Sequence, residues 1–205
     1  MTSLARAVLA IAGLAGCSAS RETAGGPAAP APAPASSPSL EQLLQRDLAA
    51  HDAIAWSAAR RLRRSDFRAD PARGSREVAR TGYGIYYASK CRGRAFEFRV
   101  IAAFHPRESW VKAEVVRDSA ESRRTLRHEQ THFNIAEVYA RRMRRHFREL
   151  VNPCARSDAA LEAEAQRLVR EERATQRRYD AETEHGLELR RQAQWEGEIG
   201  RQVGM

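Results

Sequence analysis

Two histidines, His128 and His132, stand four residues apart, and Glu129 directly follows the first of them. Four residues of an α-helix turn through about 400°, so both imidazoles would project from one side of a helix and could hold one tetrahedral metal ion. Glu129 would lie about 100° further round the helix, beside the metal. Neutral imidazole suits a zinc ligand and a carboxylate suits proton transfer. This H-E-x-x-H pattern therefore predicts a zinc hydrolase with Glu129 as its general base.

The residues around the motif predict a helix that turns the motif toward the protein core. On a helical wheel, these apolar residues share one arc with the two histidines and Glu129: Leu126, Phe133, Ile135, Ala136, Tyr139, Ala140, Met143, Phe147 and Leu150. Glu137 and the arginines of this stretch fall on the remaining arc, which we expect to face solvent. Unpartnered polar groups in a core cost several kcal/mol, and a metal ion would satisfy all three. A histidine pair hydrogen-bonded to the backbone is the alternative.

The helix that carries the motif is expected to be long. Asp118 and Glu121 form a capping-box pattern at its start. The apolar period then continues to Val151, and Asn152-Pro153 stops it, which predicts a helix of about thirty residues.

Shorter signals predict the other helices. Ser39 with Gln42 opens a short helix, and Ser157 caps a later charged helix. Gly186 is expected as the C′ residue after that later helix, and a last amphipathic stretch contains Trp195.

Strand signals precede the long helix. The stretches 81–88 and 96–100 alternate apolar with polar residues, and Arg92-Gly93 between them predicts a hairpin. The fold class is therefore α+β and mostly helical, with a small antiparallel sheet packed on the long H-E-x-x-H helix. The sheet could bind a peptide substrate as an added strand, or it could be purely structural.

The first residues read as an export signal. Arg6 precedes an apolar run at residues 7–16, which is too short to span a bilayer and suits a signal peptide. Leu14-Ala15-Gly16-Cys17 resembles the lipobox of bacterial lipoproteins, which implies cleavage before Cys17 and acylation of that residue. An ordinary secretory signal is the alternative. Residues 18–37 are rich in Ala, Pro, Gly and Ser, as in an extended tether.

These signals divide the chain into three parts. We expect a signal peptide at 1–16, a lipidated tether at 17–38 and a zincin-like metallohydrolase domain at 39–205. The protein would be an exported lipoprotein on the periplasmic face of a membrane, the outer one by preference. In that oxidising compartment Cys91 and Cys154 can form a disulfide, although two separate thiols remain possible.

The net charge of +9 comes almost wholly from arginine, because Lys90 and Lys112 are the only lysines. The arginines are spread along predicted helices among many glutamates, and no nucleic-acid motif stands out. We therefore expect solvated helix faces and no nucleic-acid partner.

Two histidines do not complete a catalytic zinc site, which usually has three protein ligands. Glu137 points to the wrong side of the helix, and His146 lies roughly 27 Å up its axis. His105, in a predicted loop, and His185, beside Gly186, both remain candidates for the third ligand.

Residues 125–137 and 179–186 resemble the paired motifs of a bacterial family of uncharacterised, predicted secreted zinc-dependent proteases. The resemblance implies a zincin-like fold, Zn²⁺ as cofactor, and His185 as the third ligand. Tyr179 and Asp180 accompany His185: they could orient a ligand imidazole or, in the case of Tyr179, stabilise an oxyanion, or they could cap the helix. For Thr183 we expect the capping role.

The leading hypothesis is an envelope zinc metallopeptidase that cleaves peptide or protein substrates and is held at the membrane by its lipid anchor. Zinc would polarise the scissile carbonyl and acidify its water, while Glu129 would take the proton and pass it to the leaving amine. One rival is a non-catalytic lipoprotein with a structural zinc, closed by His105 as a fourth ligand. Another rival is an Arg-rich interaction module that binds anionic envelope components without metal.

Overall fold

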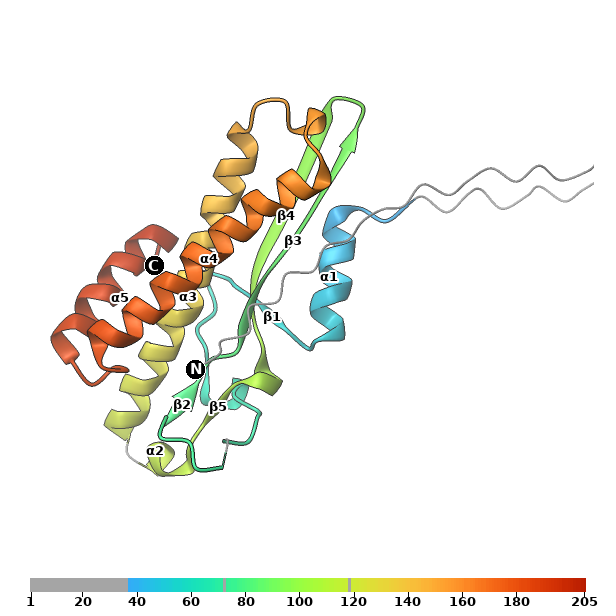
Figure 1. The fold of residues 1–205 in the computed structure, drawn as a ribbon. Coiled ribbons are helices and arrows are strands. Elements are labelled where there is room, and N and C mark those ends of the chain that lie inside the picture. Colours follow the sequence, from blue (N-terminus) through green and yellow to red (C-terminus); the bar gives the residue numbers. More distant parts are fainter. Residues whose placement is uncertain (1–36, 72, 118) are drawn as a thin grey trace, which may run out of the picture.

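The computed structural model describes residues 37–71, 73–117 and 119–205 (Figure 1). The predicted signal peptide, the lipidation residue Cys17 and nearly all of the tether lie outside these residues, as does Asp118 of the predicted capping box. None of the helices in the described ranges is both long and apolar enough to cross a membrane.

The main sheet has three antiparallel strands. β3 (Tyr83–Arg92) and β4 (Ala95–Phe104) form the predicted hairpin, and β1 (Ile54–Ala55) pairs with the other edge of β4, giving the order β1-β4-β3. Gly93 occupies the hairpin turn with a φ of 60°, a value that glycine adopts without steric cost. The hairpin is therefore confirmed, with strands longer than the alternating stretches suggested.

A second, two-stranded sheet pairs β2 with β5, and helices make up most of the remaining described residues. The bounds of these elements are β2 Ala79–Arg80, β5 Trp110–Val111, α1 Leu40–Ala50, α2 Ala113–Arg117, α3 Ser119–Glu149, α4 Asp158–Thr183 and α5 Leu189–Val203, with short 3-10 turns at Arg64–Asp66, Pro106–Glu108 and Pro153–Ala155. Ser39 caps α1 in a complete capping box with Gln42, and Ser157 caps α4, both as predicted.

The hairpin separates two apolar clusters because successive residues of a strand point to opposite faces. Tyr86 and Ala88 pack against the leucines of α1, whereas Ile85 and Tyr87 belong to the larger cluster shared with α3, α4 and α5. Figure 1 shows α1 on one side of the hairpin and the three long helices on the other. The predicted α+β fold, with a small antiparallel sheet packed on the motif-carrying helix, is confirmed.

Helix α3 is more deeply buried than the wheel suggested. Glu137, expected on a solvated face, is 4% exposed and accepts hydrogen bonds from Arg141 and Arg144. Gln130 and Asn134 are also buried, because the segment after β1 bonds to them: the backbone N–H of residue 62 donates to Gln130, and the indole of residue 56 donates to Asn134. The expectation of a solvated arc was wrong along the middle of the helix, since this segment and α5 cover its polar side.

Cys91 and Cys154 form a disulfide across 63 residues of chain. It joins the end of β3 to the turn between α3 and α4. The bond therefore fixes the start of α4 relative to the sheet, at the end of the fold where the hairpin turns (Figure 1).

Replacing both cysteines by serine should destabilise the protein. A disulfide that closes a loop of this length restricts the unfolded chain by about 4 kcal/mol in the chain-entropy model. In a domain of this size that corresponds to a fall in melting temperature of roughly 8–16 °C. Thermal unfolding of the Cys91→Ser/Cys154→Ser protein, with the oxidised parent as control, measures the effect. A change of less than about 2 °C would contradict a stabilising bond.

Candidate metal centre

His128 and His132 lie one helical turn apart in the middle of α3, and their Nε2 atoms approach to 3.1 Å. Their side chains are 6% and 12% exposed, so both rings are largely removed from water. Helical geometry alone puts the two rings on one side of α3, as the four-residue spacing predicted.

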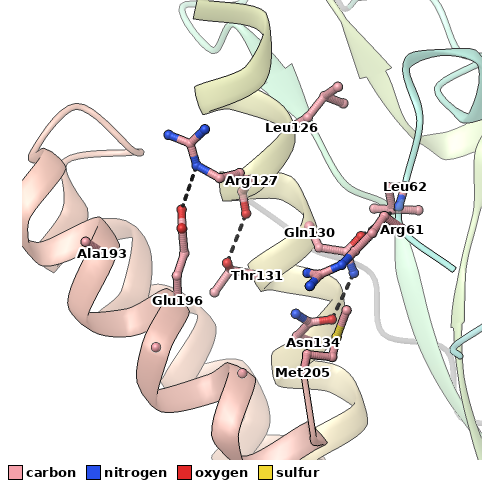
Figure 2. Close-up of a pocket in the computed structure, with 12 residues that line it drawn as sticks. Arg61, Leu62, Leu126, Arg127, Gln130, Thr131, Asn134, Ala193, Glu196 and Met205 are labelled. Atoms are coloured by element: carbon pink, nitrogen blue, oxygen red, sulfur yellow. Dashed lines mark hydrogen bonds and ion pairs between the residues drawn. The ribbon is translucent and has the colours of Figure 1, made fainter. Parts of the chain in front are cut away.

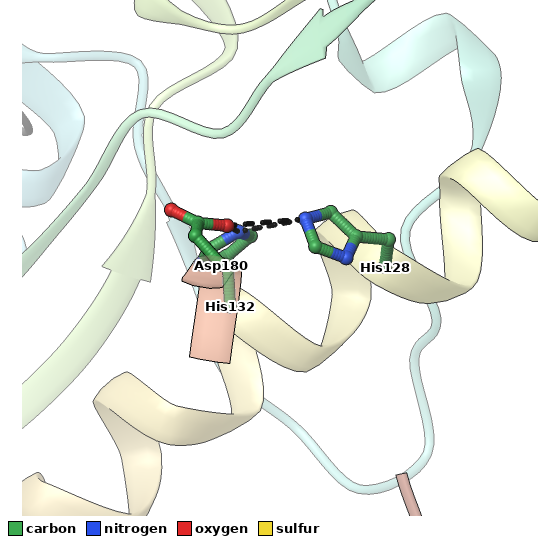
Figure 3. Close-up of side chains that lie close together, drawn as sticks. All are labelled: His128, His132 and Asp180. Carbon is green, nitrogen blue, oxygen red and sulfur yellow. Dashed lines mark hydrogen bonds and ion pairs between the residues drawn. The ribbon is translucent and has the colours of Figure 1, made fainter. Parts of the chain in front are cut away.

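Asp180, in the last turn of α4, completes a triangle of donor atoms (Figure 3). Its Oδ1 lies 2.9 Å from Nε2 of His132 and 3.3 Å from Nε2 of His128. In a tetrahedral zinc site with bonds of about 2.0–2.1 Å, neighbouring ligand atoms are about 3.3 Å apart. The three atoms thus fit Zn²⁺ with little rearrangement, and two imidazoles with one carboxylate are a donor set that hydrolytic zinc sites use.

The second nitrogen of each ring shows which atoms carry protons. Nδ1 of His128 lies 3.1 Å from Oε1 of Gln192, and Nδ1 of His132 lies 2.6 Å from Oε1 of Gln176. Because an amide oxygen only accepts, both Nδ1 atoms donate, and in the neutral rings both Nε2 atoms keep their lone pairs. Two lone pairs and a carboxylate oxygen therefore face one another, an arrangement that a cation or a proton must stabilise.

Without a metal, a proton takes that place. Burial lowers the pKa of His132, but the hydrogen bond and negative charge of Asp180 outweigh it and raise the pKa to about 9. Burial acts to raise the pKa of Asp180, and the two imidazoles more than reverse this, holding it well below its usual range. The site therefore favours positive charge between these side chains.

The ring of Tyr179 packs against the imidazoles of both His128 and His132. Its ring stacks on His128 at 4.7 Å and meets His132 edge-on at 4.8 Å. The hydroxyl is buried and donates to Gln192 and to the backbone oxygen of His128. The hydroxyl is thus engaged with Gln192 and the backbone of His128, and the predicted oxyanion role of Tyr179 stays a prediction.

Asp180 also differs from its predicted roles. It contacts the Nε2 atoms, where a ligand would sit, whereas the orienting contacts at the second nitrogens come from Gln176 and Gln192. Sequence reasoning missed both glutamines. Each lies four residues from a glutamate on its own helix, but such pairs are too frequent in helices to single these two out.

The turn after α4 brings residues 184–186 over α3. Thr183 closes the helix, accepting a hydrogen bond from the N–H of Gly186, which agrees with its expected capping role. The C-cap residue is Glu184, and it, His185 and Gly186 all have positive φ. Gly186 was predicted at C′ and instead occupies the next position, C″. A Cβ there would lie 3.1 Å from Nδ1 of His128, so glycine lets the turn pass close to that ring.

His185 reaches the edge of the site. Its Nδ1 lies 3.7 Å from Oδ1 of Asp180, and its side chain is 55% exposed. Gly186 brings this segment beside His128, and Asp180 contacts both histidines, whereas the predicted ligand role of His185 stays a prediction.

The comparisons with known proteins bear on this region. A family described as bacterial protein of unknown function (DUF922) matches residues 51–186, which contain both histidines, Asp180 and His185. The chain belongs to this family. The searches of curated proteins and of solved structures found no match. Membership of DUF922 assigns no activity, so function must be argued from the site.

Glu129 directly follows His128 on α3, within the residues that the DUF922 family covers. It is 5% exposed, and its backbone oxygen accepts a hydrogen bond from Thr81 beside β2. Burial is the main cause of the raised pKa of Tyr179, and the negative charge of Glu129 adds to it, as it adds to the effect of Asp180 on the pKa of His132. The general-base role expected for Glu129 stays a prediction.

The other candidates lie elsewhere. His105 is buried against Tyr86, whose hydroxyl is 2.8 Å from its Nε2, and its Nδ1 faces Glu108 at 3.4 Å. His146 pairs with Glu164. None of these residues belongs to the cluster of metal-ligating side chains found in the described ranges.

A pocket of about 580 Å³ lies against the opposite side of α3, facing α5 (Figure 2). Its lining includes Arg61, Arg127 and Gln130 but neither motif histidine. Arg127 pairs there with Glu196 at 3.4 Å. The metal-ligating side chains lie on the other face of α3, so we assign the site from its donor atoms and not from this pocket.

The stability of the metal-free protein should fall as the pH rises from about 6.5 to about 9, the range between the ordinary and folded pKa of His132. A raised imidazole pKa stabilises the fold fully below the lower value, and this stabilisation is lost above the upper one. Melting temperatures in chelator across this range measure it. Asp180→Asn should reduce the slope, and a parent melting temperature that rises over this range would contradict the assignment.

Proposed function

We propose that this protein is a zinc-dependent hydrolase that cleaves peptide bonds, with His128, His132 and Asp180 holding the metal. The observation that carries the proposal is the convergence of two Nε2 atoms and one carboxylate oxygen within 3.3 Å of one another. A divalent cation would relieve the repulsion between these electron pairs and the negative charge of the half-buried Asp180.

The chain supplies the groups that a hydrolysis needs. Zn²⁺, when bound, supplies a Lewis acid that polarises a carbonyl and lowers the pKa of water. Glu129 accepts the proton that water loses as it attacks the carbonyl carbon, and then returns this proton to the leaving amine nitrogen. Burial of Glu129 beside the cluster keeps competing solvent away from that transfer.

His185 is the second candidate for the third ligand, as the family resemblance implies. Its Nδ1 is 3.7 Å from the Asp180 oxygen, so a small movement of the turn would bring the ring to the metal. Its high exposure and the closer approach of Asp180 favour the carboxylate.

The sheet supports a peptide as substrate. β3 is an edge strand in the order β1-β4-β3, and an extended peptide can add to such an edge through backbone hydrogen bonds. The strand begins at Tyr83, which hydrogen-bonds to Glu172 of α4, directly behind Gln176 and His132. Residues 83–88 at this start are buried, so a peptide would add along the less buried end of β3, at residues 89–92.

The proposal also places the enzyme in the cell envelope. Acylated Cys17 would anchor it to the periplasmic face of the outer membrane, and residues 17–38 would tether the domain at 39–205. The disulfide of Cys91 and Cys154 supports export, because such bonds persist in oxidising compartments.

The geometry gives less support to the two rival hypotheses, a structural zinc and an Arg-rich interaction surface. A structural zinc needs a fourth protein ligand, and His105 is engaged with Tyr86 instead. An Arg-rich interaction surface needs free cations, whereas several helix arginines, such as Arg141 and Arg167, are paired with glutamates.

Glu129→Gln should abolish hydrolysis while preserving the metal. Removing a general base typically costs 10²–10⁴-fold in rate, and the amide cannot take the proton. Peptide cleavage by the zinc-loaded protein, together with zinc content by mass spectrometry, separates the two effects. Glu149→Gln, an exposed change on the same helix, is the matched control. Activity retained in Glu129→Gln would exclude this role.

Asp180→Asn should weaken zinc binding more than a hundredfold, beyond the 10–100-fold typical of residues behind the ligands. His185→Ala should change the affinity by less than about tenfold on the same reasoning. Chelator competition measures both, with Asp158→Asn at the exposed start of α4 as the control. If His185→Ala releases the metal and Asp180→Asn retains it, the third ligand is His185.

A further inference from the structure

Each motif histidine donates a hydrogen bond to a glutamine, and each of these glutamines donates a hydrogen bond to a glutamate. Oε1 of Gln192 accepts from Nδ1 of His128, and its Nε2 donates to Glu196 at 2.8 Å. In α4, Oε1 of Gln176 accepts from Nδ1 of the other histidine, and its Nε2 donates to Glu172 at 2.6 Å. Two helices thus supply the same histidine–glutamine–glutamate sequence of hydrogen bonds to the two rings.

The two glutamate carboxylates determine the orientation of the side-chain amides of Gln176 and Gln192. An amide could present either its oxygen or its NH₂ group to a ring, and only the oxygen forces Nδ1 to donate. When ionised, Glu196 and Glu172 can only accept, so each attracts the NH₂ end of its glutamine and leaves the oxygen for the histidine. Burial raises the pKa of Glu172 to about 7, so the orientation of Gln176 is set most strongly above that pH.

Further bonds hold the same orientation. The hydroxyl of Tyr179 donates to Oε1 of Gln192, and Nε2 of Gln176 donates to the backbone oxygen of His132. Gln176 and Gln192 are 4% and 2% exposed, so water does not compete for these bonds. Each amide therefore has one stable orientation.

The proton on Nδ1 decides whether Nε2 can bind a cation. If Nδ1 lost its acceptor, the neutral ring could carry its proton on Nε2 instead, and that nitrogen would no longer offer a lone pair. We infer that Gln176 and Gln192 are positioning residues that hold both imidazoles in the Nδ1–H form and so set the metal affinity of the site. This inference rests on the proposed function for the identity of the ligands, and it adds the residues that prepare them.

The inference assigns a role to α5. Gln192 lies beyond residue 186, where the family match ends, and its helix contributes no ligand of its own. Glu196 is in turn held by Arg127 of α3, at 3.4 Å. Packing of α5 on α3 therefore supplies the acceptor that holds His128 in the Nδ1–H form.

Gln176→Met and Gln192→Met test the inference, because methionine keeps the length of the side chain and removes the acceptor. Each variant should bind zinc 10–100-fold more weakly than the parent by chelator competition. Gln202→Met, an exposed change on α5, is the matched control and should leave the affinity unchanged. Melting temperatures of the metal-free proteins show whether each variant is folded.

A paired exchange separates positioning from mere packing. Gln192→Glu combined with Glu196→Gln reverses the order of carboxylate and amide, and the carboxylate still accepts from Nδ1 of His128. This double variant should recover zinc affinity to within about threefold of the parent, since the acceptor at Nδ1 is restored. Gln192→Glu alone places two carboxylates side by side, and its zinc affinity should be lower than that of the double variant.

Nitrogen-15 spectra of the metal-free protein at alkaline pH give a readout that needs neither zinc nor activity. In the parent, both motif rings should carry the proton on Nδ1, and Gln192→Met should lose this preference at His128.

The inference is overturned if the parent rings carry the proton on Nε2, if the methionine variants bind zinc like the parent, or if the paired exchange binds zinc no better than Gln192→Met. A parent that binds zinc but cleaves no peptide would refute the proposed hydrolase and leave this inference intact.

Discussion

The structure depends on one electrostatic constraint: two buried imidazole nitrogens and a carboxylate oxygen point at the same small space. His128 and His132 come from one turn of α3, and Asp180 comes from the end of α4. Their electron pairs repel one another unless a positive charge lies between them. Either a proton or a metal ion can supply that charge, and the tetrahedral spacing of the three atoms suits zinc.

The remaining elements hold this arrangement in place. The hairpin packs on α3 and α4, and the disulfide of Cys91 and Cys154 ties its end to the turn that precedes α4. Tyr179 fills the space behind both imidazoles, and Gly186 lets the following turn pass against one of them. Such support is needed because a ligand set misplaced by about 1 Å loses much of its function.

The sequence carried the local features well and the contacts between distant segments poorly. The spacing of the motif histidines predicted their shared side of α3, and alternation predicted the hairpin. The resemblance pointed to His185, which does lie beside the cluster, but only packing shows that Asp180 is nearer. The sequence could not identify Gln192 as a site residue, because its contact with His128 arises only when α5 packs on α3. Glu137 was expected in solvent because a helical wheel cannot show which segments cover a polar arc.

Anomalous X-ray scattering from crystals of the zinc-loaded protein, recorded on both sides of the zinc absorption edge, tests the central claim most directly. The account predicts one strong zinc peak per chain, with bonds of about 2.0–2.2 Å to Nε2 of His128, Nε2 of His132 and Oδ1 of Asp180. A fully loaded protein whose zinc lies away from these three atoms would contradict it.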